Sequence, residues 1–207
     1  MNAIVILSGG RGLRFDNQKP KQYHLLRGKE IISYVFEATC QSTVKNKIII
    51  VSNQQLPYAA DYAQGGITHN ESVKNAIDYI IEHYHNCENV VFADSARPFI
   101  TPKSIDELFD LLNEYDAITT AQEITDSLGK GGNQFVERSD YFLIQKPAAF
   151  RFDVLRKHFR ADSVCTAIIQ QIPENYRKTC YFGLKQNMKI TYPEDLVIAE
   201  AIMNNRE

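Results

Sequence analysis

The chain has 207 residues, of which 44% are hydrophobic and 23% charged, and its formal net charge is -2 at pH 7. These proportions are ordinary for a soluble globular protein, so they exclude disordered and fibrous classes, and the length predicts one domain. The small net charge provides no overall field that would attract nucleic acid or an anionic membrane. Any phosphate chemistry must therefore depend on a local cluster of cations.

Short runs rich in Val and Ile alternate with segments of helical periodicity, which is typical of βαβ units and a mostly parallel sheet. We therefore predict an α/β fold with a doubly wound sheet. The predicted strands are Ala3–Leu7, Lys47–Ser52, Asn89–Ala93, Ala117–Ala121 and Tyr181–Leu184. The predicted helices are Ile31–Cys40, Glu71–His85, Pro102–Asn113 and Pro193–Met203.

The helix predicted over Glu71–His85 has the clearest pattern, because its apolar residues recur at i, i+3, i+4 and i+7 and form one stripe. Thr68 and Glu71 have the spacing of a capping box at its start. The helices predicted at 102 and 193 begin with proline, which suits a first helical position because its missing N–H would be unpaired there.

Residues 126–145 interrupt the alternation. They follow a predicted core strand, carry three glycines in their middle and return through the sequence FVERSDYFLI. This pattern predicts a β-arm that projects from a single domain spanning 1–207. The apolar residues of the arm need a partner surface, and a second copy of the chain is one candidate.

The cysteines and the start of the chain predict the compartment. Cys40, Cys87, Cys165 and Cys180 are scattered, with neither C-x-x-C nor zinc-type spacing, which is typical of reduced cysteines. The opening MNAIVIL has no basic region of the kind found in signal peptides, and no apolar run approaches the roughly 20 residues of a membrane span. We therefore expect a cytoplasmic protein.

Four polar clusters follow predicted strands: Gly9–Lys21, 65–72, 93–99 and 187–195. Because the carboxyl ends of parallel strands meet at one edge of a sheet, we expect these clusters to lie together. The glycine-rich turn SGGRG at 8–12 allows backbone amides to approach an anion, although many such turns bind nothing. The nearby Arg14 and Lys21 supply positive charge.

These residue types suit the transfer of a nucleotidyl group. Arg14, Lys21 and Lys189 could stabilise the charge of a pentacoordinate phosphorus, and Asp94 could hold Mg²⁺ across a triphosphate. The alternatives are solvated cations and an Asp that caps a turn. The P-loop motif and D-x-D are both absent, and Phe15 occupies the third glycine position of the dinucleotide fingerprint.

Six segments, in order along the chain, resemble those of the 2-C-methyl-D-erythritol 4-phosphate cytidylyltransferases and their relatives, the D-ribitol 5-phosphate cytidylyltransferases. The family signature resembles A-A-G-x-G-x-R-M followed by P-K-Q-Y. The matching segments here are SGGRGLRF, PKQY, GGITHNESVKNAI, ADSARPFIT, QKPAAF and KITYPEDLVIAEAI.

The resemblance implies a Rossmann-like nucleotidyltransferase fold and the transfer of CMP from CTP to a polyol phosphate, with release of pyrophosphate. The leading acceptor is 2-C-methyl-D-erythritol 4-phosphate, a precursor in isoprenoid synthesis. D-Ribitol 5-phosphate or another polyol phosphate for a surface polymer is the alternative. A nucleotide-binding protein without turnover is an interpretation of another class.

Carried over position by position, the resemblance implies three groups of site residues and a homodimer in which the arm crosses to the neighbouring subunit. The catalytic cations are Arg14, Lys21 and Lys189. The nucleotide-binding residues are Ser8, Gly9, Gly10, Gly12, Gly66, Ser72 and Asp94, of which Asp94 also serves Mg²⁺. The acceptor-binding residues are Ser95, Arg97, Asp126, Ser127 and Arg138.

The departures from the family pattern fall mainly on the acceptor side. His69 stands where the family usually has Arg, Ser127 replaces a common Thr, and Lys146 and Ala148 replace the Thr and second Gln of Q-T-P-Q-A-F. Residues 163–169 lack the carboxylates of the family's T-D-D/E-A-S segment. The half of the site expected to bind CTP is nearly unchanged.

Overall fold

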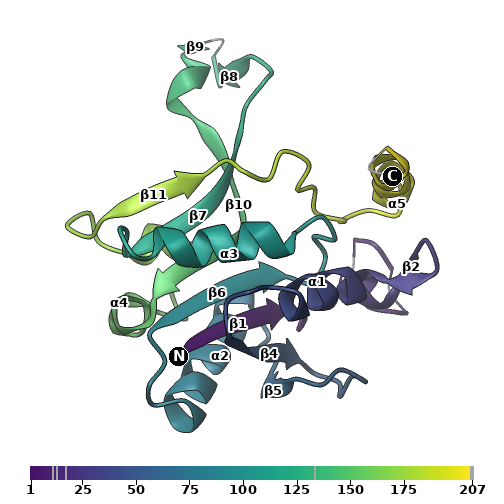
Figure 1. Cartoon of the computed structure of the whole chain (residues 1–207). Coiled ribbons are helices and arrows are strands. Elements are labelled where there is room, and N and C mark those ends of the chain that lie inside the picture. The colour runs from purple at the N-terminus through teal and green to yellow at the C-terminus, as the bar shows by residue number, and fades with distance from the viewer. Residues whose placement is uncertain (11, 13, 17, 133, 206–207) are drawn as a thin grey trace.

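A computed structural model describes residues 1–10, 12, 14–16, 18–132 and 134–205. These residues form a seven-stranded sheet with the order β11-β7-β10-β6-β1-β4-β5 (Figure 1). The strands are β1 (Asn2–Leu7), β4 (Asn46–Ser52), β5 (Asp61–Gln64), β6 (Asn89–Asp94), β7 (Ala117–Glu123), β10 (Phe142–Arg151) and β11 (Lys178–Tyr181).

The central strands are apolar because both of their faces are covered. β1 pairs in parallel with β4 and β6, β4 with β5, and β11 with β7. β10 is the antiparallel strand, inserted between β6 and β7. The prediction of an α/β fold with a mostly parallel sheet is thus confirmed.

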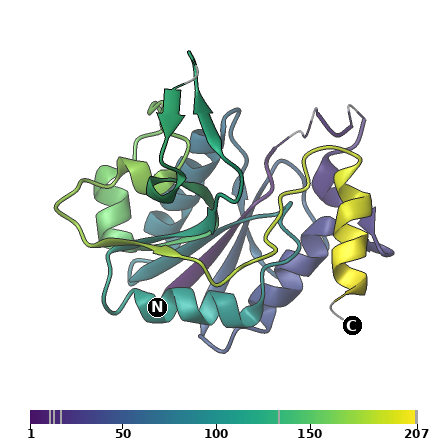
Figure 2. The ribbon, with the colours of Figure 1, turned by 90° about the horizontal axis from the view of Figure 1, so that it is seen from above.

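Helices cover the two faces of the sheet (Figure 2). α1 (Ile31–Cys40) and α3 (Pro102–Leu111) lie on one face, and α2 (His69–His83) and α4 (Phe152–His158) lie on the other. Adjacent strand residues point to opposite faces, so Val5 packs into the core under α2 whereas Ile6 packs into the core under α1.

Helix α2 begins at the predicted capping box. The Thr68 side chain accepts a hydrogen bond from the Glu71 backbone N–H, and Glu71 accepts one from the Thr68 N–H. α3 begins in the same way, with Thr101 as N-cap and Pro102 at its first position. Both helix starts are therefore determined by local sequence.

The chain differs from prediction at both edges of the sheet. β11 covers Lys178–Tyr181 and not Tyr181–Leu184, because an edge strand with half-buried residues does not need the apolar run that we expected further on. The strand at the opposite edge, β5, also lacks an apolar run, and we did not predict it from the sequence. α5 (Asp195–Asn204) begins two residues after Pro193.

A small hairpin stands away from the main sheet, beyond the ends of β7 and β10 (Figure 1). Its strands, β8 (Leu128–Lys130) and β9 (Gln134–Val136), pair antiparallel in a sheet of their own. The remaining short elements are β2 (Leu25–Leu26), β3 (Lys29–Glu30) and 3-10 turns at Lys21–Tyr23, Arg138–Asp140 and Ile168–Gln171. Within the described ranges, no helix combines the length and apolar character needed to cross a membrane.

Candidate active site

A cavity of about 990 Å³ opens at the carboxyl ends of β1, β4, β5 and β6. Segments that are far apart in the sequence meet here, from the first loop to the region before α5. The predicted residues that line the cavity are Ser8, Gly9, Gly10, Gly12, Arg14, Lys21, Gly66, Ser72, Asp94, Ser95 and Lys189. All residues predicted to bind the nucleotide or to act as catalytic cations therefore share one cavity.

The glycine-rich turn is held in place by Gln22, which is 2% exposed. The Gln22 Nε2 donates hydrogen bonds to the carbonyl oxygens of Ser8, at 2.8 Å, and of Gly10, at 3.3 Å. These bonds fix the backbone of Ser8 and Gly10 beside the cavity. Positions 11, 13 and 17 lie outside the described residues. The Ser8 Oγ is buried, and none of the described residues bonds to it.

A second loop, leading into α2, packs against the first. The Ser72 Oγ accepts a hydrogen bond from the Gly66 N–H at 3.0 Å. A Cβ on Gly66 would lie 2.3 Å from the Glu71 Cβ, so only glycine allows this close approach. The N-terminus of α2 consequently faces the cavity, and the partial positive charge of a helix N-terminus favours anions.

Asp94 is the carboxylate of the cavity. Its Oδ2 lies 2.9 Å from the Lys189 Nζ and 3.4 Å from the Arg97 Nε. Burial raises the pKa of Asp94, but the positive charges of Lys189, Arg97 and Lys146 lower it more, and the net pKa is far below the ordinary value of 3.8. Asp94 is therefore ionised at any pH at which the protein would work.

Lys21 is a cation in an unfavourable setting. Burial, and then repulsion from Lys189, lower its pKa from 10.5 to about 8, with further repulsion from Arg14 and Arg97. Asp94 is the opposing charge. One carboxylate thus faces several cations, so the cavity carries a surplus of positive charge that an anionic ligand would neutralise.

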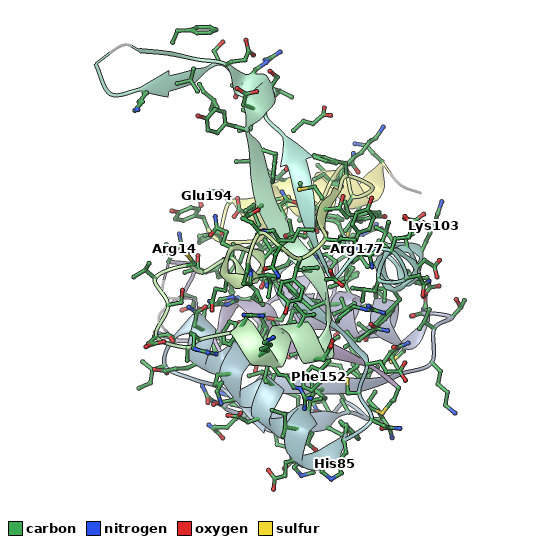
Figure 3. The ribbon with its side chains drawn as sticks, turned by 90° about the vertical axis from the view of Figure 1, so that its left-hand side faces the viewer. Arg14, His85, Lys103, Phe152, Arg177 and Glu194 are labelled. Atoms are coloured by element: carbon green, nitrogen blue, oxygen red, sulfur yellow. The ribbon has the colours of Figure 1, made fainter. Side chains whose placement is uncertain are left out.

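The first loop also meets the segment before α5. The Arg14 guanidinium lies 5.7 Å from the centroid of the Tyr192 ring, a distance at which a cation is attracted to an aromatic face. Figure 3 shows Arg14 and Glu194 on the same side of the molecule. Cations from the two ends of the chain therefore flank one cavity.

Behind Asp94, Asn187 joins three segments. Its carbonyl oxygen accepts a hydrogen bond from the Arg97 Nη1 at 2.5 Å, and its Nδ2 donates to the carbonyl oxygen of Lys146 at 2.6 Å. Gln22 and Asn187 were both missed in the sequence, although Gln22 lies inside the segment PKQY and Asn187 lies inside the polar cluster at 187–195. The Gln22 side chain donates to backbone carbonyl oxygens, and the Asn187 side chain donates to the backbone of Lys146 and to the Gln145 Oε1, partners that no spacing rule reveals.

The predicted arm residues lie elsewhere. Asp126 and Ser127 are exposed between β7 and β8, and Arg138, also exposed, donates a hydrogen bond to the carbonyl oxygen of Thr125. They do not line the cavity of their own chain. Of the predicted acceptor residues, Ser95 lines the cavity and Arg97 contacts Asp94.

Solved structures with this fold are known from several bacteria. The 2-C-methyl-D-erythritol 4-phosphate cytidylyltransferase of Thermus thermophilus matches with a TM-score of 0.81 and 21% identity, over 99% of this chain and 100% of that chain. The enzyme of the same description from Francisella tularensis matches with a TM-score of 0.77 and 25% identity, over 97% and 98% of the two chains.

The sequence comparisons agree with the structural ones. A relative from Azobacteroides pseudotrichonymphae, also described as 2-C-methyl-D-erythritol 4-phosphate cytidylyltransferase, is 33% identical over 97% of this chain and 98% of its own length. One from Thermosipho melanesiensis with the same description is 29% identical over 96% of each. The family model of that description matches residues 2–205, and the chain therefore belongs to the 2-C-methyl-D-erythritol 4-phosphate cytidylyltransferase family.

Proposed function

We propose that this chain transfers CMP from CTP to 2-C-methyl-D-erythritol 4-phosphate, with release of pyrophosphate, as its family description implies. The observation that carries the proposal is the meeting of Arg14, Lys21 and Lys189 around Asp94 in one cavity next to a glycine-rich turn. The surplus of positive charge fits a triphosphate, and the buried Ser8 Oγ offers an unused hydrogen bond to a ligand.

In this mechanism an oxygen of the acceptor phosphate attacks the α-phosphorus of CTP. A P–O bond forms, and the bond between the α-phosphorus and the bridging oxygen breaks, so pyrophosphate leaves with the electron pair. The attacking oxygen is already anionic, and no protein nucleophile or proton transfer is needed. Arg14, Lys21 and Lys189 then act by positioning the phosphates and by stabilising the charge of the transition state.

The donor set around Asp94 fits Mg²⁺ shared with a triphosphate. In the described part of the chain no three His, Cys, Asp or Glu side chains are grouped as a metal site, and Mg²⁺ is usually bound by one or two carboxylates together with substrate phosphates. Lys189 and Arg97 contact Oδ2 of Asp94, and the Asp94 carboxylate is the group that would hold the metal. When bound, Mg²⁺ would neutralise phosphate charge and orient the triphosphate.

The arm supports a proposal that the working unit is a homodimer. Apolar side chains of the arm and of the adjoining part of β10 are exposed: Phe135, Tyr141, Phe142, Leu143 and Ile144. A second copy of the chain would cover them. In such a dimer Asp126, Ser127 and Arg138 would reach the acceptor in the neighbouring subunit, which explains why they are absent from their own cavity.

The test is pyrophosphate release from CTP and Mg²⁺ with a panel of polyol phosphates. We expect turnover with 2-C-methyl-D-erythritol 4-phosphate and none after chelation of the metal. Turnover with D-ribitol 5-phosphate alone would reassign the acceptor. Tight binding of CTP without pyrophosphate release for any acceptor would overturn the proposal.

A further inference from the structure

The cavity has a charged end and an uncharged end. Lys21, Asp94 and Lys189 come from the segments that follow β1, β6 and β11, and Lys189 contacts Asp94. The lining residues that follow β4 and β5, at 53–54 and 65–68, carry no charge. The order of the strands places β4 and β5 on the far side of β1 from β6. Because a triphosphate belongs with the cations, the nucleoside of CTP extends toward the uncharged end.

Asn53 stands at the uncharged end. It is the first residue after β4, it is exposed, and it lines the cavity. Its Oδ1 accepts a hydrogen bond from the Gln64 Nε2 at 2.6 Å, and its Nδ2 donates to the carbonyl oxygen of Gly9 at 3.5 Å. Gln64 therefore determines which way round the amide lies, with its oxygen toward β5 and its NH2 group toward the glycine-rich turn.

The flat face of the Asn53 amide lies against Gly65. A Cβ on Gly65 would lie 2.8 Å from the Asn53 Oδ1, 2.9 Å from Cγ and 2.9 Å from Nδ2. These nearly equal distances place the plane of the amide across the position of that Cβ, and glycine leaves room for it. Although Asn53 is exposed, its amide is thus held at its oxygen and along one face in a single orientation.

The NH2 group of Asn53 has donor capacity to spare. A primary amide carries two N–H donors. Among the described residues its acceptor is the Gly9 carbonyl oxygen, at the outer limit of a hydrogen bond. At least one N–H is therefore available to a ligand in the cavity, and the ligand must present a hydrogen-bond acceptor there.

Ile67 provides an apolar contact at the same end. Its side chain is 98% exposed although it lines the cavity, and its backbone N–H donates to the Glu71 Oε2 at 2.7 Å. An aliphatic side chain on such a fixed loop gains free energy by covering an apolar surface. A nucleobase has apolar faces and a polar edge, so one base offers a partner both to Ile67 and to the Asn53 NH2 group.

We propose that Asn53 donates a hydrogen bond to the edge of the cytosine base of CTP that carries the acceptors O2 and N3. The assignment rests on the proposed cytidylyl transfer, which makes CTP the nucleotide. Position 53 lies outside the six segments that resemble the family. Asn53 is then a determinant of nucleotide binding that is particular to this chain.

The test compares the Kd for CTP with the Kd for inorganic tripolyphosphate, each with Mg²⁺, by calorimetry on wild type and Asn53→Ala. Tripolyphosphate fits the charged end but carries no base. For Asn53→Ala we expect the Kd for CTP to rise at least about fivefold, the size of one hydrogen bond, and the Kd for tripolyphosphate to change less than about twofold. At saturating CTP, kcat should stay within about twofold of wild type.

Asn53→Asp separates hydrogen-bond donation from shape. It keeps an oxygen for the Gln64 Nε2 and the flat form of the group, but it replaces the donor with an acceptor. The ratio of the Kd for CTP to that for tripolyphosphate should rise at least as much as in Asn53→Ala, because the ratio removes the effect of the added charge on the phosphates. Gln55→Ala, an exposed residue of the same loop outside the cavity lining, is the matched control and should leave both Kd values unchanged.

Two results would overturn the proposal. Equal rises of both Kd values in Asn53→Ala would mean that Asn53 only supports the glycine-rich turn. An unchanged ratio of the two Kd values in Asn53→Asp would mean that the base does not meet the amide.

Because the readout is binding, this proposal stays distinct from the proposed function. If wild type binds CTP but releases no pyrophosphate with any acceptor, the proposed function fails, and the Kd values still decide the role of Asn53. If wild type turns over and the Asn53 variants bind CTP as it does, the role of Asn53 fails alone. A wild type that binds no CTP overturns both.

Discussion

A substitution of Lys21 tests whether cations of the cavity stabilise the charge of the transition state. It lines the cavity with Arg14 and Lys189 and is repelled by both. We predict that Lys21→Ala lowers kcat by at least about a hundredfold, the order expected for one lost contact to developing charge. Stability should change little, because the substitution also relieves repulsion. Steady-state kinetics and thermal unfolding measure the two effects.

The matched control for Lys21 is Lys19→Ala, an exposed lysine of the same loop. It should leave kcat within about twofold of wild type. A Lys21 variant that is no slower than the Lys19 variant would contradict the role assigned to Lys21.

The alkaline pH dependence should report the same group. The pKa of Lys21 and that of Lys146 are each lowered to about 8, by burial first. Both are charged below that pH and lose the proton above it, so kcat/KM should fall as pH rises through about 8, since this ratio reports the free enzyme. Lys21→Arg keeps its charge and should move its share of the decline to higher pH. A profile that stays flat to about pH 9.5 would contradict the prediction.

Among single residues of the site, the sequence predicts the charged side chains that follow strands. Arg14, Lys21, Asp94 and Lys189 could be predicted because the ends of parallel strands meet at one edge. Gln22 and Asn187 could not, since their partners are carbonyl oxygens that folding brings near. The burial of Lys146 depends on β10 being inserted antiparallel next to β6, which alternation of strands and helices does not indicate.

Among the elements, the start of α2 and the loop before it form one packed unit. Gly66 sits against Glu71 so closely that an added Cβ has no room. We predict that Gly66→Ala forces this loop away from α2, lowers the free energy of unfolding by about 1–3 kcal/mol and weakens CTP binding. Chemical denaturation and calorimetry measure these effects.

Gly131, in the turn of the arm, provides the control. A Cβ there meets nothing within 4 Å, so Gly131→Ala should leave both quantities unchanged. Equal behaviour of the two alanine variants would contradict the role of the close contact.

The elements that could be predicted are those with a pattern of their own. α1 matches its prediction at both ends, and α2 begins close to its capping box. Prediction failed at β5 and β11, because pairing with an inner neighbour defines an edge strand more than its own apolar content does. Pro193 marked α5 two residues early, because the backbone N–H groups of Thr191 and Tyr192 bond to Asp195 and form a turn before the helix.

At the level of the whole molecule, a substitution in the arm tests whether the chain forms a dimer through it. Phe135 in β9 is 86% exposed, and we predict that Phe135→Asp prevents dimer formation by placing a charge in a covered apolar contact. Light scattering should give about 47 kDa for wild type, twice the 23.7 kDa of one chain, and the mass of one chain for the variant.

Val197→Asp introduces the same charge at an exposed apolar position on α5, away from the arm. It should remain a dimer. A Phe135 variant that stays dimeric, or a wild type that is monomeric at assay concentration, would remove the arm from the interface.

β10 connects the base of the arm, at Phe142, with Arg151 beside the core, and its pairing with β7 shifts register between Gln145 and Ala148. The arm residues Asp126, Ser127 and Arg138, proposed to contact the acceptor in the neighbouring subunit, can do so only while the two subunits are associated. The cavity residues predicted to bind the nucleotide lie at the carboxyl ends of β1, β4, β5 and β6, and they do not depend on the arm. Diluting the protein until the subunits separate should therefore leave the affinity for CTP unchanged and weaken the affinity for the acceptor. The ratio of the two affinities should then depend on protein concentration.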